Sequence, residues 1–298
     1  KNIVVEGMSD FSSKLGKLVS TYLSKDDSCN FTQTTQGEAV GRVSHKNIEG
    51  GEYSDEYTME YHFDNSISDP IYIAHEVGNL IAKNASLENG SFSRHLNEVQ
   101  AFFTQHIIYD YLINEHSNQT IKGAALNHFN GEMQRSLFSL TVGLSTLNVE
   151  REFSDIGSED RISEAGDFFT KDIKDQWLGE NWEKYYYALA SKEHLSSHES
   201  RDYFISKIHT HSSGSIVAAS LFAYSKTLNG EERDGLIDLV LYPGKDKGIE
   251  HILNEIVVNS KEDLDSFLQK GFELIEENKS KHKDLLNDIG KERSERIR

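Results

Sequence analysis

The segment IYIAHEVGNLIAKN, Ile71 to Asn84, places polar side chains at a spacing that zinc chemistry uses. His75 and residue 79 are four positions apart, so on a helix they share one face, as two zinc-binding imidazoles must. Glu76 stands beside them, where a carboxylate acts as general base for zinc-bound water. Position 79, however, holds Asn79 instead of a second histidine. The segment therefore supplies two of the three expected groups.

Glu98 is the candidate for a third ligand. It lies 23 residues after His75 (98 − 75) and opens the run EVQAFFTQHIIYDYLI, whose apolar residues on nearly every face predict a buried helix. A carboxylate there is costly to desolvate unless it is paired or metal-bound. The alternative is an exposed glutamate that the helix dipole favours in the first turn. The sequence leaves both readings open.

Helical spacing over long stretches and only two prolines predict a mainly helical chain. Ser9 is the expected N-cap of a first helix whose apolar face runs to Tyr22. In the next segment apolar and polar residues alternate, and this period of two predicts a small hairpin or sheet over residues 38–64. The alternating residues are Tyr57, Met59, Tyr61 and Phe63.

The helix that carries His75 is expected over residues 70–84, because Asp69 can cap it and Pro70 fits its first position. The stretch NASLENGSFS reads as a loop, and a second helix is expected from near Asn97. Further helices are predicted over 121–148, 160–176, 180–192, 199–228, 231–241, 247–258 and 261–281. The charged tail after Lys279 is expected to fray or to end a long exposed helix.

Composition narrows the function classes. A net charge of −18 disfavours nucleic-acid binding, which needs Lys and Arg to displace counterions. No apolar run reaches the roughly 18 residues that a bilayer span requires, and the single cysteine, Cys29, excludes an internal disulfide framework. A single domain over 1–298 is expected, with a helix and sheet in 1–69, the metal-site helices in 70–115 and a helical remainder in 116–298. A monomer is the default, and cytoplasmic and exported locations both stay open.

Several segments in order resemble one enzyme family. MEYHFDNSISDPIYIAHEVGN is similar to the aromatic strand, loop and zinc helix of the thimet oligopeptidase and oligopeptidase F family, and NEVQAFFTQHIIYDYL resembles its next helix. SSGSIVAASLFAYS, IDLVLYPGKDKGIEHILNEI and EDLDSFLQKGFELIEE resemble its C-terminal, cleft-closing segments. The resemblance covers about residues 9–278 and implies a helical zinc-peptidase core with one zinc ion. His75 and Glu98 would be ligands, and Glu76 would be the general base.

The departures from the family pattern matter equally. Asn79 stands where the second zinc histidine belongs, and a neutral amide is a poor substitute for imidazole on zinc. Gln105 stands where the family has an orienting glutamate, seven residues after the ligand glutamate. These changes predict a weak or absent zinc site in this form. If Asn79 is an introduced change, the natural chain has the full ligand set.

Downstream, the family places a histidine and tyrosines before its Gly-rich helix to stabilise the reaction intermediate. By that resemblance His209 and His211 occupy tyrosine positions, with Tyr203 near them. Both imidazoles would then be catalytic donors to an oxyanion; the alternative is that they are polar residues in a loop that enters a helix. Gly214 would serve cleft closure or, alternatively, close helix packing.

Three functions follow as expectations. The first is a zinc metalloendopeptidase acting on peptides or proteins, inactive or impaired in this form because of Asn79. The second is a non-catalytic pseudopeptidase that retains the peptide groove, and the third is a helical domain without peptidase ancestry. Only 74 residues precede His75, which predicts a cleft open to larger substrates than the family usually accepts.

Overall fold

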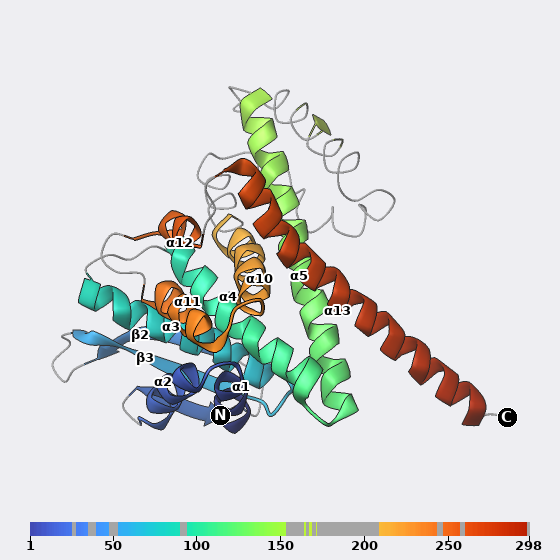
Figure 1. Cartoon of the computed structure of the whole chain (residues 1–298), viewed down its shortest axis with the longest axis horizontal. Helices are drawn as coiled ribbons and strands as arrows, with labels where there is room; N and C mark the ends of the chain where they lie inside the picture. Colours follow the sequence, from blue (N-terminus) through green and yellow to red (C-terminus); the bar gives the residue numbers. More distant parts are fainter. Residues whose placement is uncertain are drawn as a thin grey trace. The chain divides into compact units, whose positions relative to one another are not determined.

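The computed structural model describes residues 1–25, 28–34, 40–47, 53–89, 94–152, 209–242, 247–256 and 260–296, together with residues 164, 167, 168 and 171. The N-terminal elements are α1 Asn2–Phe11, α2 Ser13–Ser24, β1 Cys29–Gln33, β2 Val40–Asn47 and β3 Tyr53–Phe63 (Figure 1). The helices that follow are α3 Ser68–Asn89, α4 Arg94–Asp110, a π-helical turn Tyr111–Glu115 and α5 Gln119–Glu152. The C-terminal elements are a π-helical turn His209–Ser213, α10 Gly214–Ser225, α11 Gly230–Leu241, α12 Ile249–Glu255 and α13 Lys261–Arg296. The mainly helical fold with a small sheet is confirmed.

The chain divides into two compact units. Residues 1–133 and 214–298 form the first, and residues 134–213 form the second. Every contact described below lies inside the first unit. The helix predicted over 180–192 lies outside the described residues, and so does nearly all of the one predicted over 160–176. Within the part of the chain that is described, no helix combines the length and apolar character needed to cross a bilayer.

The sheet has three strands in the order β1-β3-β2. β2 pairs with β3 antiparallel, with Val43 opposite Met59, and it lies within the predicted range. β1 pairs with β3 in parallel, with Cys29 opposite Met59, and the sequence did not predict it. Met59 and Tyr61 are buried, as their alternation with polar residues indicated. α3 packs against this sheet, so the strands support the helix that carries His75.

Asn84 contacts β3 just before the point where β1 begins to pair with it. Its Oδ1 accepts the backbone N–H of Tyr57 at 2.9 Å, and its Nδ2 donates to the Tyr57 carbonyl at 3.4 Å. The side-chain amide thus makes the two contacts that another strand residue would make. This is why the predicted loop after Asn84 is wrong at its start: Asn84 is anchored by β3, and α3 continues to Asn89.

The first predicted helix is two helices. Ser9 lies inside α1, and the backbone becomes extended at Ser12, whose side chain accepts the Leu15 backbone N–H and caps α2. The expected cap at Ser9 is therefore wrong by three residues. Residue Ser12 also donates to Asp234 at the start of α11, so this break is held by a tertiary contact that periodicity does not reveal.

α3 and α4 are packed backbone to backbone near His75. A Cβ placed on Gly78 would lie 2.3 Å from Thr104 Oγ1 and 2.8 Å from Ala101 Cα, so only glycine allows this approach. Thr104 Oγ1 donates to the Ala74 carbonyl at 2.8 Å and joins the helices at the same level. α4 is buried along most of its length, as its apolar run predicted.

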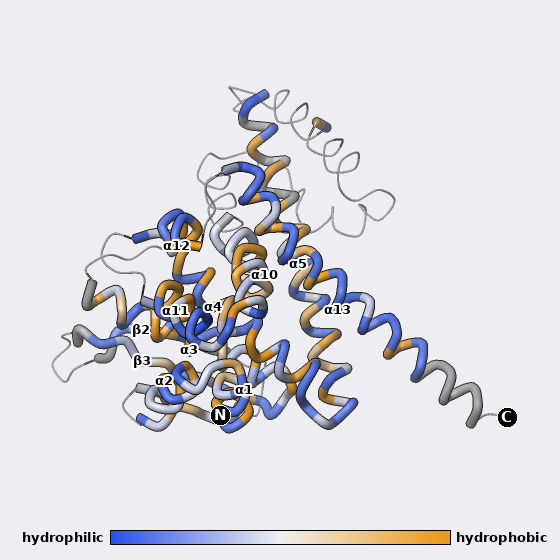
Figure 2. The backbone as a smooth tube through the Cα atoms, viewed as in Figure 1, coloured by the Kyte–Doolittle hydropathy of each residue, from blue (hydrophilic) through white to orange (hydrophobic). Residues whose placement is uncertain are grey.

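The C-terminal helices close over α4. α10 is apolar along most of its length, whereas α13 carries long hydrophilic stretches (Figure 2). α10 packs on both α4 and α13. The contact with α13 is close, since a Cβ on Gly271 would lie 2.9 Å from the Ser220 backbone nitrogen. α13 continues to Arg296, beyond the predicted bound at residue 281, so the charged tail after Lys279 ends a long helix, which was one of its two expected states.

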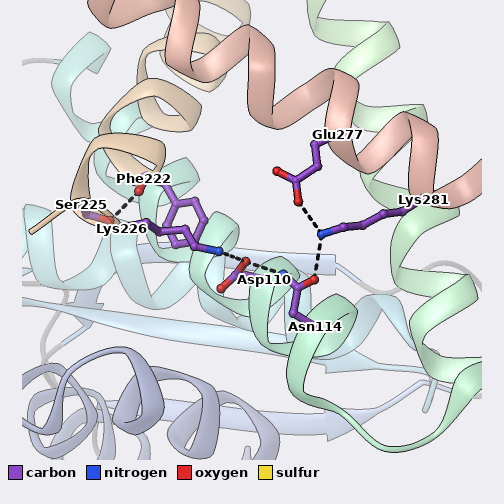
Figure 3. Close-up of polar contacts among 7 residues, drawn as sticks. All are labelled: Asp110, Asn114, Phe222, Ser225, Lys226, Glu277 and Lys281. Carbon is purple, nitrogen blue, oxygen red and sulfur yellow. Dashed lines mark hydrogen bonds and ion pairs between the residues drawn. The ribbon is translucent and has the colours of Figure 1, made fainter.

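A polar network ties the end of α4 to the C-terminal helices (Figure 3). Asp110 Oδ1 accepts from Lys226 Nζ at 2.7 Å and from Asn114 Nδ2 at 2.6 Å. Lys281 on α13 then donates to Asn114 Oδ1 at 2.9 Å and lies 2.8 Å from Glu277. Partly exposed ion pairs each contribute little. Within this network, the bond from Lys281 to Asn114 joins α13 to the turn after α4.

Cys29 is expected to react slowly with alkylating reagents. Burial raises the pKa of its thiol to about 11, from an ordinary value of 9.0. Because the thiolate is the reactive form, a rise of two units lowers its fraction at pH 8 by roughly 100-fold. Iodoacetamide labelling of the folded chain should therefore be about 100-fold slower than labelling in urea. Equal rates in both conditions would contradict the burial of this thiol.

Candidate functional site

His75 is held by a hydrogen bond and an aromatic contact. Its Nδ1 lies 2.9 Å from Gln105 Oε1, and its ring meets Phe102 edge-on with centroids 4.9 Å apart. With the amide oxygen towards the ring, Nδ1 carries the proton and Nε2 keeps its lone pair; a turned amide would exchange the two roles. Gln105 lacks the carboxylate that the resemblance implied, but its amide still orients the imidazole, as partners of metal-binding histidines do.

Asn79 is engaged on both sides of its amide. Its Nδ2 donates to Glu76 Oε2 at 3.4 Å, and its Oδ1 accepts from Asn97 Nδ2. A carboxylate cannot donate, so the NH₂ group must face Glu76 and the oxygen must face Asn97. The side chain is buried with 8% of its surface exposed, which leaves little room for another orientation. Asn79 therefore bridges Glu76 and Asn97.

Glu98 is half-buried in the first turns of α4. Gly214, the first residue of α10, lies against it: a Cβ on Gly214 would be 3.2 Å from Glu98 Cβ. This contact supports the packing role for Gly214, because a larger residue would push α10 away from Glu98. The two segments that the resemblance joined in one site are thus adjacent.

Lys83 brings a positive charge to this region. It lies one turn after Asn79 on α3, and its Nζ donates to the Val43 carbonyl of β2 at 3.1 Å. Burial lowers the pKa of the Lys83 ammonium, while the negative charges of Glu76 and Glu98 act in the opposite direction. The ammonium therefore offsets part of the charge of the two carboxylates.

Glu76 lies against the bare backbone of β2. A Cβ on Gly41 would be 2.4 Å from Glu76 Cγ and 2.9 Å from its Cδ, so a side chain at position 41 would displace the carboxylate. β2 is an outer strand of the sheet and pairs with β3 alone among the described strands. The carboxylate consequently lies close to the backbone of an edge strand.

These donors do not fit a three-ligand zinc site. His75 Nε2 and the Glu98 carboxylate are suitable ligands, but the oxygen of Asn79 already accepts from Asn97 and is a poor zinc ligand, and its amide nitrogen has no lone pair to give. No group of three or more His, Cys, Asp or Glu side chains is arranged for a metal in the described part of the chain. A zinc ion would find two ligands where stable protein sites supply three or four.

The prediction also includes Tyr203, His209 and His211, which follow these helices in the chain. Tyr203 falls outside the described residues, and so does the side chain of His209. His211 is exposed on the π-helical turn before α10 and belongs to the second unit. Their roles as oxyanion donors remain predictions.

Sequence reasoning missed Lys83, Asn97 and the partners of Gln105 farther inside the core. Lys83 had a signal, since it follows His75 and Asn79 at the same helical spacing. Asn97 and the core partners act through long-range contacts, for which periodicity gives no sign. With this geometry described, comparison with models of known protein families finds no match, and neither do comparisons with curated proteins or with solved structures.

Proposed function

We propose that this chain is a degenerate zinc-metallopeptidase core that binds peptide or protein segments, with hydrolysis lost or impaired by Asn79. The observation that carries the proposal is the Asn79 amide, which joins Glu76 to Asn97 at the position where the resemblance implies a zinc ligand. The amide thus gives both of its ends a protein partner, Glu76 on one side and Asn97 on the other. The ordered resemblance to the oligopeptidase family supplies the ancestry.

Peptide binding is supported by the edge strand beside Glu76. An outer strand presents backbone N–H and C=O groups to which an extended peptide can add as a further strand. β2 has such an edge, on which the Val43 carbonyl already accepts from Lys83, and Gly41 keeps the strand backbone close to Glu76. A bound peptide would then run past the His75 and Glu76 side chains. The acidic surface, with a net charge of −18, favours cationic peptides among the ligands.

A zinc metalloendopeptidase is the second candidate. The proton on His75 Nδ1 leaves Nε2 available to a metal, and Glu76 and Glu98 lie on the two helices that the family uses. This function requires a third ligand, which histidine at position 79 would provide. The two candidates therefore differ at one residue.

The proposal is tested with ten-residue synthetic peptides of cationic composition, labelled with fluorescein. Anisotropy should show saturable binding, and mass spectrometry should find the peptides intact after incubation with zinc. Each binding peptide is then N-methylated at alternate residues, in two complementary sets. Along a strand successive N–H groups point to opposite edges, so one set should weaken binding by about tenfold or more and the other should have little effect.

Equal effects of the two N-methylated sets would exclude addition to an edge strand. If no peptide binds, the peptide-binding proposal fails. Zinc-dependent cleavage by the chain with Asn79 would replace the non-catalytic reading with the second candidate.

A further inference from the structure

Gln105 belongs to a longer line of hydrogen bonds that begins at His75. Gln105 Nε2 is 3.2 Å from the Tyr109 hydroxyl, which is 2.7 Å from His128 Nδ1. His128 Nε2 in turn lies 3.2 Å from the Tyr72 hydroxyl. The line starts on α3, crosses α4 to α5 and returns to α3, one turn before His75.

The middle of this line is sealed from water. Gln105 and Tyr109 expose 2% and 1% of their surfaces. The two histidines on either side of them, His75 and His128, are half-buried. Buried polar groups of this kind keep their hydrogen bonds, because an unmade one costs about 1–3 kcal/mol. If one histidine exchanged its protonated and bare ring nitrogens, every other group along the line would therefore have to exchange donor and acceptor roles as well.

The orientation of the Gln105 amide, with its oxygen towards His75, gives the line one direction. His75 Nδ1–H donates to Gln105 Oε1, and the Gln105 NH₂ donates to the Tyr109 oxygen. The Tyr109 hydroxyl has one hydrogen, which it donates to His128 Nδ1. His128 then carries its proton on Nε2 and donates to Tyr72. If each group donates once within the line, the only other arrangement reverses all four bonds.

We propose that Gln105 and Tyr109 couple the tautomer of His75 to that of His128 and hold Nε2 of His75 as a hydrogen-bond acceptor. Gln105, Tyr109 and His128 are then positioning residues that act through His75. In the reversed direction Nε2 would carry the proton and become a donor. The coupling makes two histidines on different helices switch together.

This direction defines the ligand chemistry of the site. With a lone pair on Nε2, His75 is suited to a group that donates, such as a peptide N–H or an ammonium. A ligand carboxylate or carbonyl could not accept a hydrogen bond from this nitrogen. The choice of ligand rests on the proposed peptide-binding function, whereas the coupling between the histidines does not.

The test is NMR of the full chain labelled with ¹⁵N-histidine, at pH 8.5, which lies above the ordinary histidine pKa of about 6.5. Two-bond ¹H–¹⁵N correlations distinguish a protonated ring nitrogen from a bare one. The chain has 13 histidines, so His75→Gln and His128→Gln identify the two signals. His75 should appear with its proton on Nδ1, and His128 with its proton on Nε2.

Tyr109→Phe removes the central hydroxyl without changing the packing volume. The Nε2 signal of His75 should then move from the bare position towards the protonated one, because the Gln105 amide can turn and donate to Nδ1. Tyr61→Phe is the matched control: Tyr61 is equally buried, and its hydroxyl donates to Asp69 at 3.1 Å, outside the line. It should leave both histidines unchanged. Should Tyr109→Phe fail to fold, His128→Phe breaks the line at its half-buried end and should shift His75 in the same way.

The coupling is overturned if His75 carries its proton on Nε2 in the unaltered chain. It is equally overturned if His75 keeps one tautomer when Tyr109 or His128 is replaced, or if Tyr61→Phe shifts it as much. Failure of the peptide-binding experiment with this NMR pattern intact would remove the proposed function and leave the coupling in place.

Discussion

Replacing Asn79 with histidine should raise zinc affinity by more than about 100-fold. Loss of a partner that only orients a ligand costs 10- to 100-fold in metal affinity, and the change at position 79 adds a ligand itself. An imidazole there lies one helical turn from His75 and has the nitrogen lone pair that the amide lacks. It also removes the hydrogen bond from Asn79 to Glu76. Zinc affinity is measured by competition with a fluorescent chelator.

Asn79→Ala is the matched control for this prediction. It removes the same amide and the same contact with Glu76 but adds no ligand, so its zinc affinity should stay near that of the unaltered chain. Hydrolysis of the bound peptides is a second readout: Asn79→His should cleave them, and the double variant with Glu76→Gln should bind zinc without cleaving. If Asn79→His binds zinc no better than Asn79→Ala, the resemblance to a metallopeptidase site is wrong.

Gly78→Ala should destabilise the chain by about 3 kcal/mol. The added methyl group would lie 2.8 Å from Ala101 Cα and 3.0 Å from the Gln100 carbonyl, so α3 and α4 must separate to admit it. Overpacking of this kind typically costs 1–3 kcal/mol, and backbone atoms cannot turn away as a side chain can. The separation would also lengthen the bond from His75 to Gln105. Urea unfolding gives the free energy.

Gly235→Ala supplies the comparison. Gly235 lies within α11, and a Cβ there would meet nothing within 4 Å. The same substitution should therefore stabilise the chain by roughly 0.4–1 kcal/mol, since alanine is the better helix former. Equal changes at Gly78 and Gly235 would show that α3 and α4 are not in backbone contact.

Much of the architecture around His75 could be predicted from local pattern. Apolar periodicity and the Asp69-Pro70 start located α3 to within two residues at its beginning, and the apolar run after Glu98 located α4. These elements are long and strongly periodic, which is where single-sequence reasoning works best. The short strand β1 carries no such signal, because CNFTQ lacks alternation and is held by its pairing with β3.

The candidate site was likewise predictable only in part. His75, Glu76, Asn79 and Glu98 were found from spacing and resemblance, and the structure places them on adjacent helices. The state of Asn79 was not predictable, because its two partners are known only once α3 and α4 are packed together. The line from Gln105 to His128 depends likewise on α5, whose sequence gives no reason to connect it with His75.

The contact between Asn84 and Tyr57 bears on modification of the chain. Asn84, Ala85 and Ser86 form a sequence to which an N-linked sugar can be attached. The nitrogen that would carry the sugar donates to a backbone carbonyl of β3 in the folded chain. A carbohydrate there would have to displace Asn84 from the sheet. Folding therefore protects this asparagine, and a glycan found on it would mean attachment before β3 and α3 had packed.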